Sequence, residues 1–155
     1  MAESFRTGDR AGAQGKRKRD YNRGMSKEAI ATAKAPAAIG PYSQGVRTGC
    51  LIFTAGQIAL DPATQDVVTG GIAEQTARVF ENLKAILESA GSNLDRVVKA
   101  TVFLKDINDF AAMNKVYGSY LAGEGKTPPA RTTVEVSRLP KDVLVEIDLV
   151  AEVGA

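Results

Sequence analysis

Apolar residues recur at two different spacings along the chain, and each spacing predicts a local structure. A helical spacing predicts one helix over residues 72–90, which Gly91 ends, and a second over residues 110–121, which Asn108 or Asp109 can cap. Alternating or short apolar runs predict strands. These strands lie at about residues 43–46, 51–58, 97–104, 130–136 and 143–153.

The order of these elements is β-β-α-β-α-β-β, which predicts an α+β sandwich: a mostly antiparallel sheet with two helices on one face. The last two strands are expected to form a hairpin around a turn at residues 137–140. Burying both apolar rows of this hairpin beneath the helices turns Arg131 and Glu146 to the opposite face. In the register centred on Arg138 and Leu139, these two charged residues are direct cross-strand neighbours.

Arg131 and Glu146 allow two interpretations. As an ordinary ion pair on a solvated sheet face they are worth about 1 kcal/mol or less, and charge patterning alone favours this interpretation. Alternatively they lie in a partly dry cleft, because Leu144 and Val150 interrupt the polar face and indicate a partner surface. In such a cleft Arg131 can bind a carboxylate through two hydrogen bonds, and Glu146 can transfer a proton.

The 155-residue chain contains no His and a single Cys, and this composition excludes several kinds of active site. Neither a Ser-His-Asp or Cys-His nucleophile nor a zinc site of Cys and His ligands can be built within it. Proton chemistry near neutral pH then depends on carboxylates, Tyr, Lys, backbone groups or water. A single Cys forms no intrachain disulfide, which suits the cytoplasm, and no apolar run approaches the roughly 20 residues of a membrane span.

Charge divides the chain into a basic leader, residues 1–24, and a mildly acidic domain, residues 27–155. The leader holds seven Lys/Arg and three Asp/Glu, which leaves thirteen and fifteen for residues 25–155, a net charge of −2. Its few apolar residues predict a segment without a fold of its own. The basic run at residues 16–19 is compatible with a solvated tail, a nuclear address, a nucleic-acid contact or an organelle transit segment, and these alternatives stay open.

Three further residues have both a structural and a functional interpretation. Tyr42 follows Gly40 and Pro41 at a rigid turn, where it either packs or offers its hydroxyl to a ligand. Asn114 lies off the apolar stripe of the second helix and is either solvated or part of a pocket. Gly56 either marks a β-bulge or lets a ligand approach the backbone closely.

Five sequence blocks, taken in order, carry a family resemblance. They are residues 37–44, 55–58, 108–110 with 113–117, 129–136, and 139–141 with 145–147. Together they closely resemble the Rid family of reactive enamine/imine deaminases, also called YjgF-like proteins and formerly endoribonuclease L-PSP. Five blocks in the right order are far more specific than any one alone. The resemblance covers residues 27–153 and leaves the leader out.

The resemblance implies a chorismate-mutase-like α+β fold that assembles into a homotrimer, with the sheets forming a central barrel and three clefts between subunits. It implies hydrolysis of 2-aminoacrylate, 2-aminocrotonate and related 2-imino acids to 2-keto acids and ammonia, without a cofactor or a metal. Such a 2-iminobutanoate/2-iminopropanoate deaminase, a hydrolase acting on C=N bonds, limits metabolite damage to pyridoxal-phosphate enzymes.

Mapped onto this chain, the resemblance implies that Arg131 holds the substrate carboxylate and that Glu146 assists proton transfer, directly or through a positioned water. Many bacterial members carry Cys where this chain has Thr133, so a role for that side chain stays open. Tyr42 is expected to act across a subunit boundary. The remaining residues of the implied substrate site are Ala55, Gly56 and Asn114, with backbone contacts at Thr133.

Two other functions remain as alternatives. The family's older label and the basic run at residues 16–19 suggest an RNA-binding or RNA-cleaving translation inhibitor, although metal-free RNA cleavage without His is chemically difficult. The third candidate is a non-catalytic trimer that binds small ligands or acts like a chaperone.

Overall fold

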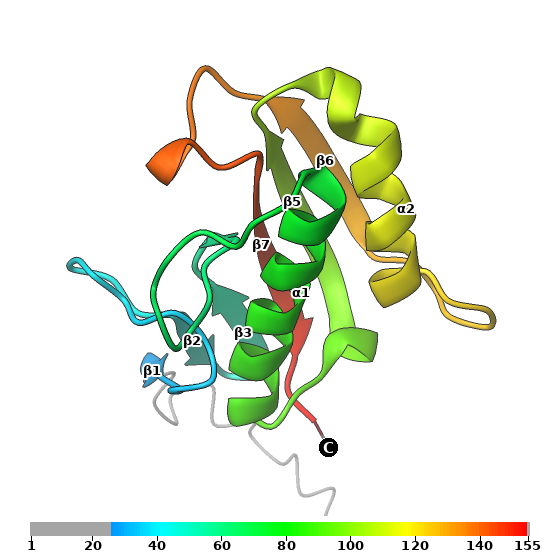
Figure 1. The fold of residues 1–155 in the computed structure, drawn as a ribbon. Coiled ribbons are helices and arrows are strands. Elements are labelled where there is room, and N and C mark those ends of the chain that lie inside the picture. Colours follow the sequence, from blue (N-terminus) through cyan, green and yellow to red (C-terminus); the bar gives the residue numbers. More distant parts are fainter. Residues whose placement is uncertain (1–25, 155) are drawn as a thin grey trace, which may run out of the picture.

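The computed structural model describes residues 26–154, which form one sheet and two helices (Figure 1). Short 3₁₀ turns precede β5, α2 and β7. In chain order the strands and helices are β1 (Glu28–Ile30), β2 (Gly45–Thr48), β3 (Leu51–Thr54), β4 (Gln57–Ile58), α1 (Ile72–Ser89), β5 (Val97–Leu104), α2 (Phe110–Leu121), β6 (Ala130–Glu135) and β7 (Val145–Glu152).

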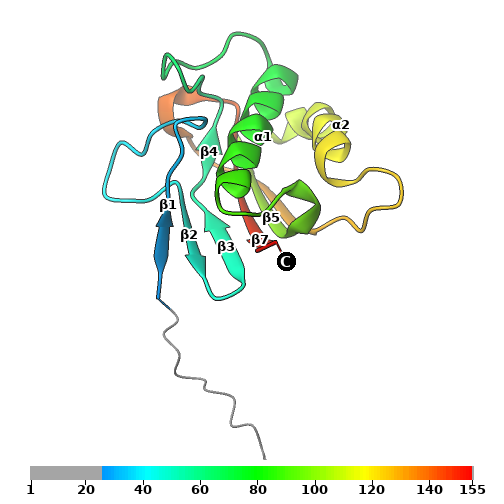
Figure 2. The same cartoon turned by 90° about the horizontal axis from the view of Figure 1, so that it is seen from below.

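The sheet has the order β1-β2-β3-β7-β5-β6, and the short β4 also pairs with β7. Every pair is antiparallel except β5 with β6, which the crossover through α2 makes parallel. Both helices lie on the same face of the sheet, as Figures 1 and 2 show. The expected α+β architecture, with two helices on one face, is therefore confirmed.

Helix α1 supplies much of the core. Gly71 precedes its first residue and donates its N–H to Glu74 Oε2 at 2.8 Å, so the carboxylate satisfies one free amide at the helix start. Gly91 follows the helix at φ 76°, a left-handed conformation that a glycine adopts without strain. The fully buried apolar stripe consists of Val79, Phe80, Leu83, Ile86 and Leu87.

Helix α2 begins where its apolar pattern predicts, but its cap differs from the expected one. Asp109 has helical backbone angles and makes no capping hydrogen bond with its side chain. Asp106 lies in extended conformation, and its Oδ1 accepts a hydrogen bond from the N–H of Asn108 at 2.8 Å. The 3₁₀ turn at Ile107–Asp109 therefore moves the cap three residues towards the N-terminus.

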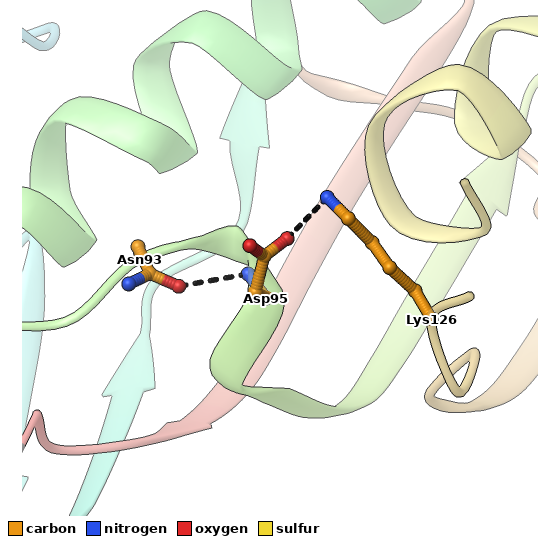
Figure 3. Close-up of polar contacts among 3 residues, drawn as sticks. All are labelled: Asn93, Asp95 and Lys126. Carbon is orange, nitrogen blue, oxygen red and sulfur yellow. Dashed lines mark hydrogen bonds and ion pairs between the residues drawn. The ribbon is translucent and has the colours of Figure 1, made fainter. Parts of the chain in front are cut away.

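The loop that follows α2 is tied to the turn that precedes β5. Figure 3 shows Lys126 Nζ against Asp95 Oδ1, while Asn93 Oδ1 accepts a hydrogen bond from the Asp95 amide at 2.9 Å. The pair is exposed, so it contributes about 1 kcal/mol or less. It links two segments that lie side by side before the paired strands β5 and β6.

The expected hairpin between β6 and β7 is wrong, because β5 lies between these two strands. The N–H of Val136 donates to the carbonyl of Leu104, and the N–H of Lys105 donates to the carbonyl of Leu144. The segment between β6 and β7 therefore passes around the end of β5 instead of making a tight turn. Lys141 and Asp142 in that segment have positive φ, which bends the chain towards β7.

Because β5 intervenes, the predicted neighbours Arg131 and Glu146 lie on opposite faces of the sheet. Arg131 pairs with Ala100, which also pairs with Leu149, and both apolar residues are buried beneath the helices. Glu146 pairs with Phe103, which is an odd number of positions along β5 from Ala100. Because side chains alternate between the two faces of a strand, Glu146 faces away from the helices. The placement of Glu146 is as predicted, whereas that of Arg131 is reversed.

The face of the sheet opposite the helices is partly apolar. Phe53 pairs with Val150, and Phe103 pairs with Val134, so two apolar cross-strand pairs lie on this open face. Phe53 is 42% exposed and Val134 is 39% exposed. Leu144, which was expected here, packs against the core instead.

No helix among residues 26–154 is long and apolar enough to cross a membrane. The basic leader lies outside these residues, so the predictions about it are untested.

Candidate functional site

A cavity of about 470 Å³ lies beside the end of β7 and contains four of the predicted site residues. These are Tyr42, Ala55, Gly56 and Glu146. The exposed loop around Ile39 and the turn at Lys141 complete its walls. Most of the lining is apolar, and Glu146 is the one carboxylate among the residues that line this cavity.

The backbone at Ala55 and Gly56 reaches the cavity because the sheet ladder is interrupted there. Phe53 of β3 pairs with Val150 of β7, and Gln57 of β4 pairs with Ile147 of β7. The segment from β3 to β4 therefore has one residue more between the two pairs than β7 has. Thr54 Oγ1 accepts the hydrogen bond from the N–H of Leu149 at 2.9 Å. Gly56 therefore marks a bulge and also borders the cavity. Close approach of a ligand to its backbone stays a prediction.

Glycine at position 56 leaves room for the Glu146 carboxyl group. A Cβ atom built on Gly56 overlaps Glu146 Oε1 and lies 2.9 Å from its Cδ. Any larger residue at this position displaces the carboxyl group, which is the movable end of its side chain.

Burial raises the pKa of Glu146 above its ordinary value of 4.5, and the nearby carboxylate of Asp148 raises it further. Asp148 lies two residues along β7 on the same face, and burial raises its pKa as well. Thr101 and Lys99 act in the opposite direction on Asp148. Glu146 is thereby shifted towards the range in which a carboxyl group exchanges protons near neutral pH.

Gln44 holds the base of the loop that carries Tyr42. Its Oε1 accepts a hydrogen bond from the N–H of Thr32 at 2.6 Å. Its Nε2 donates to the carbonyls of Thr32, Ala35 and Pro36. Gln44 lies in one of the five sequence blocks, but the sequence does not predict this role. A side-chain amide can both donate and accept hydrogen bonds, so its role becomes clear only when its partners are known.

Arg131 belongs to a second cluster, between β6 and α2. Its Nη1 donates to Asn114 Oδ1 at 2.8 Å, and its guanidinium carbon lies 4.5 Å from the ring centre of Tyr117. Asn114 is thus a partner of Arg131 and not merely solvated. No carboxylate in residues 26–154 forms an ion pair with Arg131, so its charge is free to bind an anion.

Thr133 lies two residues beyond Arg131 on the helix-facing side of β6, opposite the buried Val102. Its hydroxyl oxygen is buried and has no hydrogen-bond partner among the described residues. The side chain points away from the cavity that contains Glu146.

Within one subunit the predicted site residues therefore form two separate groups. Tyr42, Ala55, Gly56 and Glu146 line the cavity, and Arg131, Asn114 and Thr133 lie on the helix-facing side of β6. No group of three or more Asp, Glu or Cys side chains among residues 26–154 is arranged to hold a metal ion.

Comparison with known proteins shows the family. The model of the family described as Endoribonuclease L-PSP matches residues 32–153. A RutC family protein of Pyrococcus abyssi is 60% identical over 127 residues, which cover 82% of this chain and 98% of the relative. The chain belongs to the Rid (YjgF/endoribonuclease L-PSP) family.

Two other relatives of this Rid protein have informative names. The 2-iminobutanoate/2-iminopropanoate deaminase of Salmonella typhimurium is 50% identical over 127 residues, which cover 82% of this chain and 98% of the enzyme. The crystal structure of Escherichia coli TdcF with bound serine has 43% sequence identity and a TM-score of 0.76, and the match covers 81% of this chain and 98% of TdcF.

The pKa of Glu146 leads to a prediction about stability. Because the pKa is raised on folding, the folded protein binds this proton more tightly than the unfolded chain does. The resulting stabilisation is complete below the ordinary pKa and is lost as pH rises through the folded-state value. Replacing Glu146 with Gln removes this loss, so the Glu146→Gln variant should gain stability relative to wild type at about pH 8 but not at about pH 4.

Urea unfolding at both pH values measures this difference. Glu88→Gln, on the exposed face of α1, is the control for removing one negative charge. An equal effect of Glu146→Gln at both pH values, or a loss of stability at the higher one, would contradict the burial of the Glu146 carboxylate.

Proposed function

We propose that this Rid protein hydrolyses small 2-imino acids, such as 2-iminobutanoate and 2-iminopropanoate, to 2-keto acids and ammonia. The observation that carries the proposal is that the chain presents two chemically complementary groups, on opposite faces of the sheet. One is a guanidinium without an anionic partner, and the other is a carboxyl group whose pKa is raised by burial. The name of the Salmonella relative supports the same substrates.

The two groups match the two ends of such a substrate. The Arg131 guanidinium binds the substrate carboxylate through parallel hydrogen bonds. Glu146 transfers protons at the other end, where the enamine takes up a proton at C3 to become an iminium ion and water then adds to C2 and gives up a proton. The C2–N bond of the resulting carbinolamine then breaks, ammonia leaves and a C2 carbonyl remains, with no net oxidation or reduction.

Neither step requires a strong catalyst, because enamine tautomerisation and imine hydrolysis are intrinsically easy reactions. Positioning the carboxylate next to one proton donor and one water supplies most of what is needed. This reaction is compatible with a chain that has no His.

The active site in this proposal lies between subunits. Arg131 and Glu146 of one chain face opposite sides of the sheet, and a substrate of four carbons cannot reach both. A neighbouring copy can bring its Arg131 cluster to the Glu146 cavity if its contacts cover the partly apolar open face. Repeating one such head-to-tail contact around a threefold axis gives a closed homotrimer with three equivalent sites.

The structure of TdcF with bound serine is consistent with this scheme, because serine, like the proposed substrates, carries a nitrogen on the carbon next to its carboxylate. The RNA-related alternative rests on the family's older label and on the basic run at residues 16–19, which lies outside the described residues. Residues 26–154 carry a net negative charge, which disfavours binding to a phosphate backbone.

A coupled assay tests the proposed activity. Threonine dehydratase generates 2-aminocrotonate, and the rate of 2-oxobutanoate formation is followed against the spontaneous rate. Wild type should accelerate the reaction, and Arg131→Ala should lower kcat/KM by about 10- to 100-fold, because a charged hydrogen-bonded anchor is lost. Lys126→Ala removes a positive charge that pairs with Asp95 and makes no described contact with Arg131, so it should behave like wild type.

No acceleration by the wild type would contradict the activity. Acceleration that Arg131→Ala leaves unchanged would contradict the anchor. Binding of 2-oxobutanoate without turnover would favour the non-catalytic alternative.

The close contact between Gly56 and Glu146 allows a second test of the proposal in the same assay. Gly56→Ala places a methyl group where the Glu146 carboxyl lies and should lower kcat by about 10- to 100-fold, because the proton-transferring group is displaced. Gly118→Ala, in α2, is the matched control: no neighbouring atom lies within 4 Å of its added Cβ. Full activity of Gly56→Ala would show that the position of the Glu146 carboxyl is unimportant.

A further inference from the structure

We infer that Tyr117, together with Phe110, is a positioning residue that fixes the plane of the Arg131 guanidinium and so sets the affinity for the substrate carboxylate. This inference rests on the proposed function and adds two aromatic residues that the family resemblance did not assign. Both residues belong to the apolar spacing that predicts the second helix, and that spacing does not reveal their contact with Arg131.

One stripe of α2 makes all of the side-chain contacts described for Arg131. Phe110, Asn114 and Tyr117 are spaced i, i+4 and i+7, so they lie on the same side of the helix. The guanidinium carbon of Arg131 lies 5.4 Å from the ring centre of Phe110 and 4.5 Å from that of Tyr117. Both distances are within the range of cation–π attraction.

Tyr117 is held in place by the core. It is 4% exposed, and its ring packs edge-on against the ring of Phe80 at a centroid distance of 5.7 Å. Phe80 is itself fully buried in α1. The ring beneath Arg131 is therefore fixed by contacts from both helices, so the guanidinium lies on a rigid surface.

The contact of Tyr117 with Arg131 is through its ring and not through a charged oxygen. Burial raises the pKa of Tyr117, and Arg131 only partly opposes this rise, so the phenol stays neutral. The hydroxyl has no hydrogen-bond partner among residues 26–154. The ring alone is therefore expected to do the positioning, and loss of the hydroxyl should have little effect.

Fixing the guanidinium plane matters because a carboxylate binds Arg through two parallel, coplanar hydrogen bonds. Asn114 occupies one Nη1 hydrogen, and the two rings restrict rotation of the group. The remaining donors are then held in one plane before the ligand arrives, which reduces the entropy lost on binding. Lysine has no such plane and cannot replace Arg131 here.

The experiment compares Tyr117→Leu, Tyr117→Phe and the matched control Tyr120→Leu. Tyr120 lies in the same helix and stacks on the same Phe80 ring at 4.7 Å, but its hydroxyl donates to Glu81 and it has no cation–π contact with Arg131. The Kd of 2-oxobutanoate is measured by calorimetry, and KM and kcat are measured in the coupled assay. Phe110→Leu is a second test variant, because it removes the outer ring without opening the fully buried core.

Tyr117→Leu and Phe110→Leu should raise Kd and KM by about 3- to 30-fold with little change in kcat, since a desolvated cation–π contact is lost. Tyr117→Phe and Tyr120→Leu should keep the wild-type Kd. In an Arg131→Ala background, Tyr117→Leu should cause no further loss of binding.

Wild-type affinity in a folded Tyr117→Leu or Phe110→Leu protein would overturn the inference, and so would an equal loss in Tyr120→Leu. Weaker binding in Tyr117→Leu by a protein that shows no turnover would support the positioning role while contradicting the proposed activity. Absence of carboxylate binding by the wild type would contradict both.

Discussion

Strand β5 lies between β6 and β7, and this placement determines how the candidate site is built. The two outer strands carry Arg131 and Glu146, and their registers with β5 differ by an odd number of positions: Arg131 pairs with Ala100, and Glu146 pairs with Phe103. Side chains alternate between the faces of a strand, so the two residues necessarily point in opposite directions. A complete site of the proposed kind then requires a second copy of the chain.

The two halves of the site are prepared by different physical means. Burial and the carboxylate of Asp148 raise the pKa of Glu146, and the absent side chain of Gly56 gives its carboxyl group a place beside the cavity. Arg131 is prepared by contact with neutral groups: two aromatic rings and one amide support it without neutralising its charge. Within one subunit the cation and the titratable carboxyl group therefore stay apart. A direct ion pair between them would lower the availability of both.

Local patterns were sufficient to predict most of the fold. The spacing of apolar residues located α1, α2 and β5, and the alternation along β7 assigned Glu146 to the correct face. The hairpin prediction failed because two consecutive strands need not be neighbours in a sheet. The predicted face of Arg131 was wrong because β6 is an edge strand, and its helix-facing side accommodates polar residues. Arg131 is stabilised there by Tyr117 and Asn114, contacts that the periodicity of β6 alone does not reveal. The family resemblance singled out Arg131 and Glu146, but only the register shows that they lie on opposite faces of one subunit.

The central claim is that each site combines Arg131 of one subunit with Glu146 of another, and complementation between inactive variants tests it most directly. Arg131→Ala and Glu146→Gln subunits are co-expressed in equal amounts and assayed for imine hydrolysis. If subunits mix at random, about three quarters of the trimers contain both variants, and each has one interface with both side chains intact, so about a quarter of the wild-type activity should return. Mixing either variant with the Arg131→Ala/Glu146→Gln double variant should restore none. Activity no higher than that of the separate variants, in trimers shown to be mixed, would contradict a site shared between subunits.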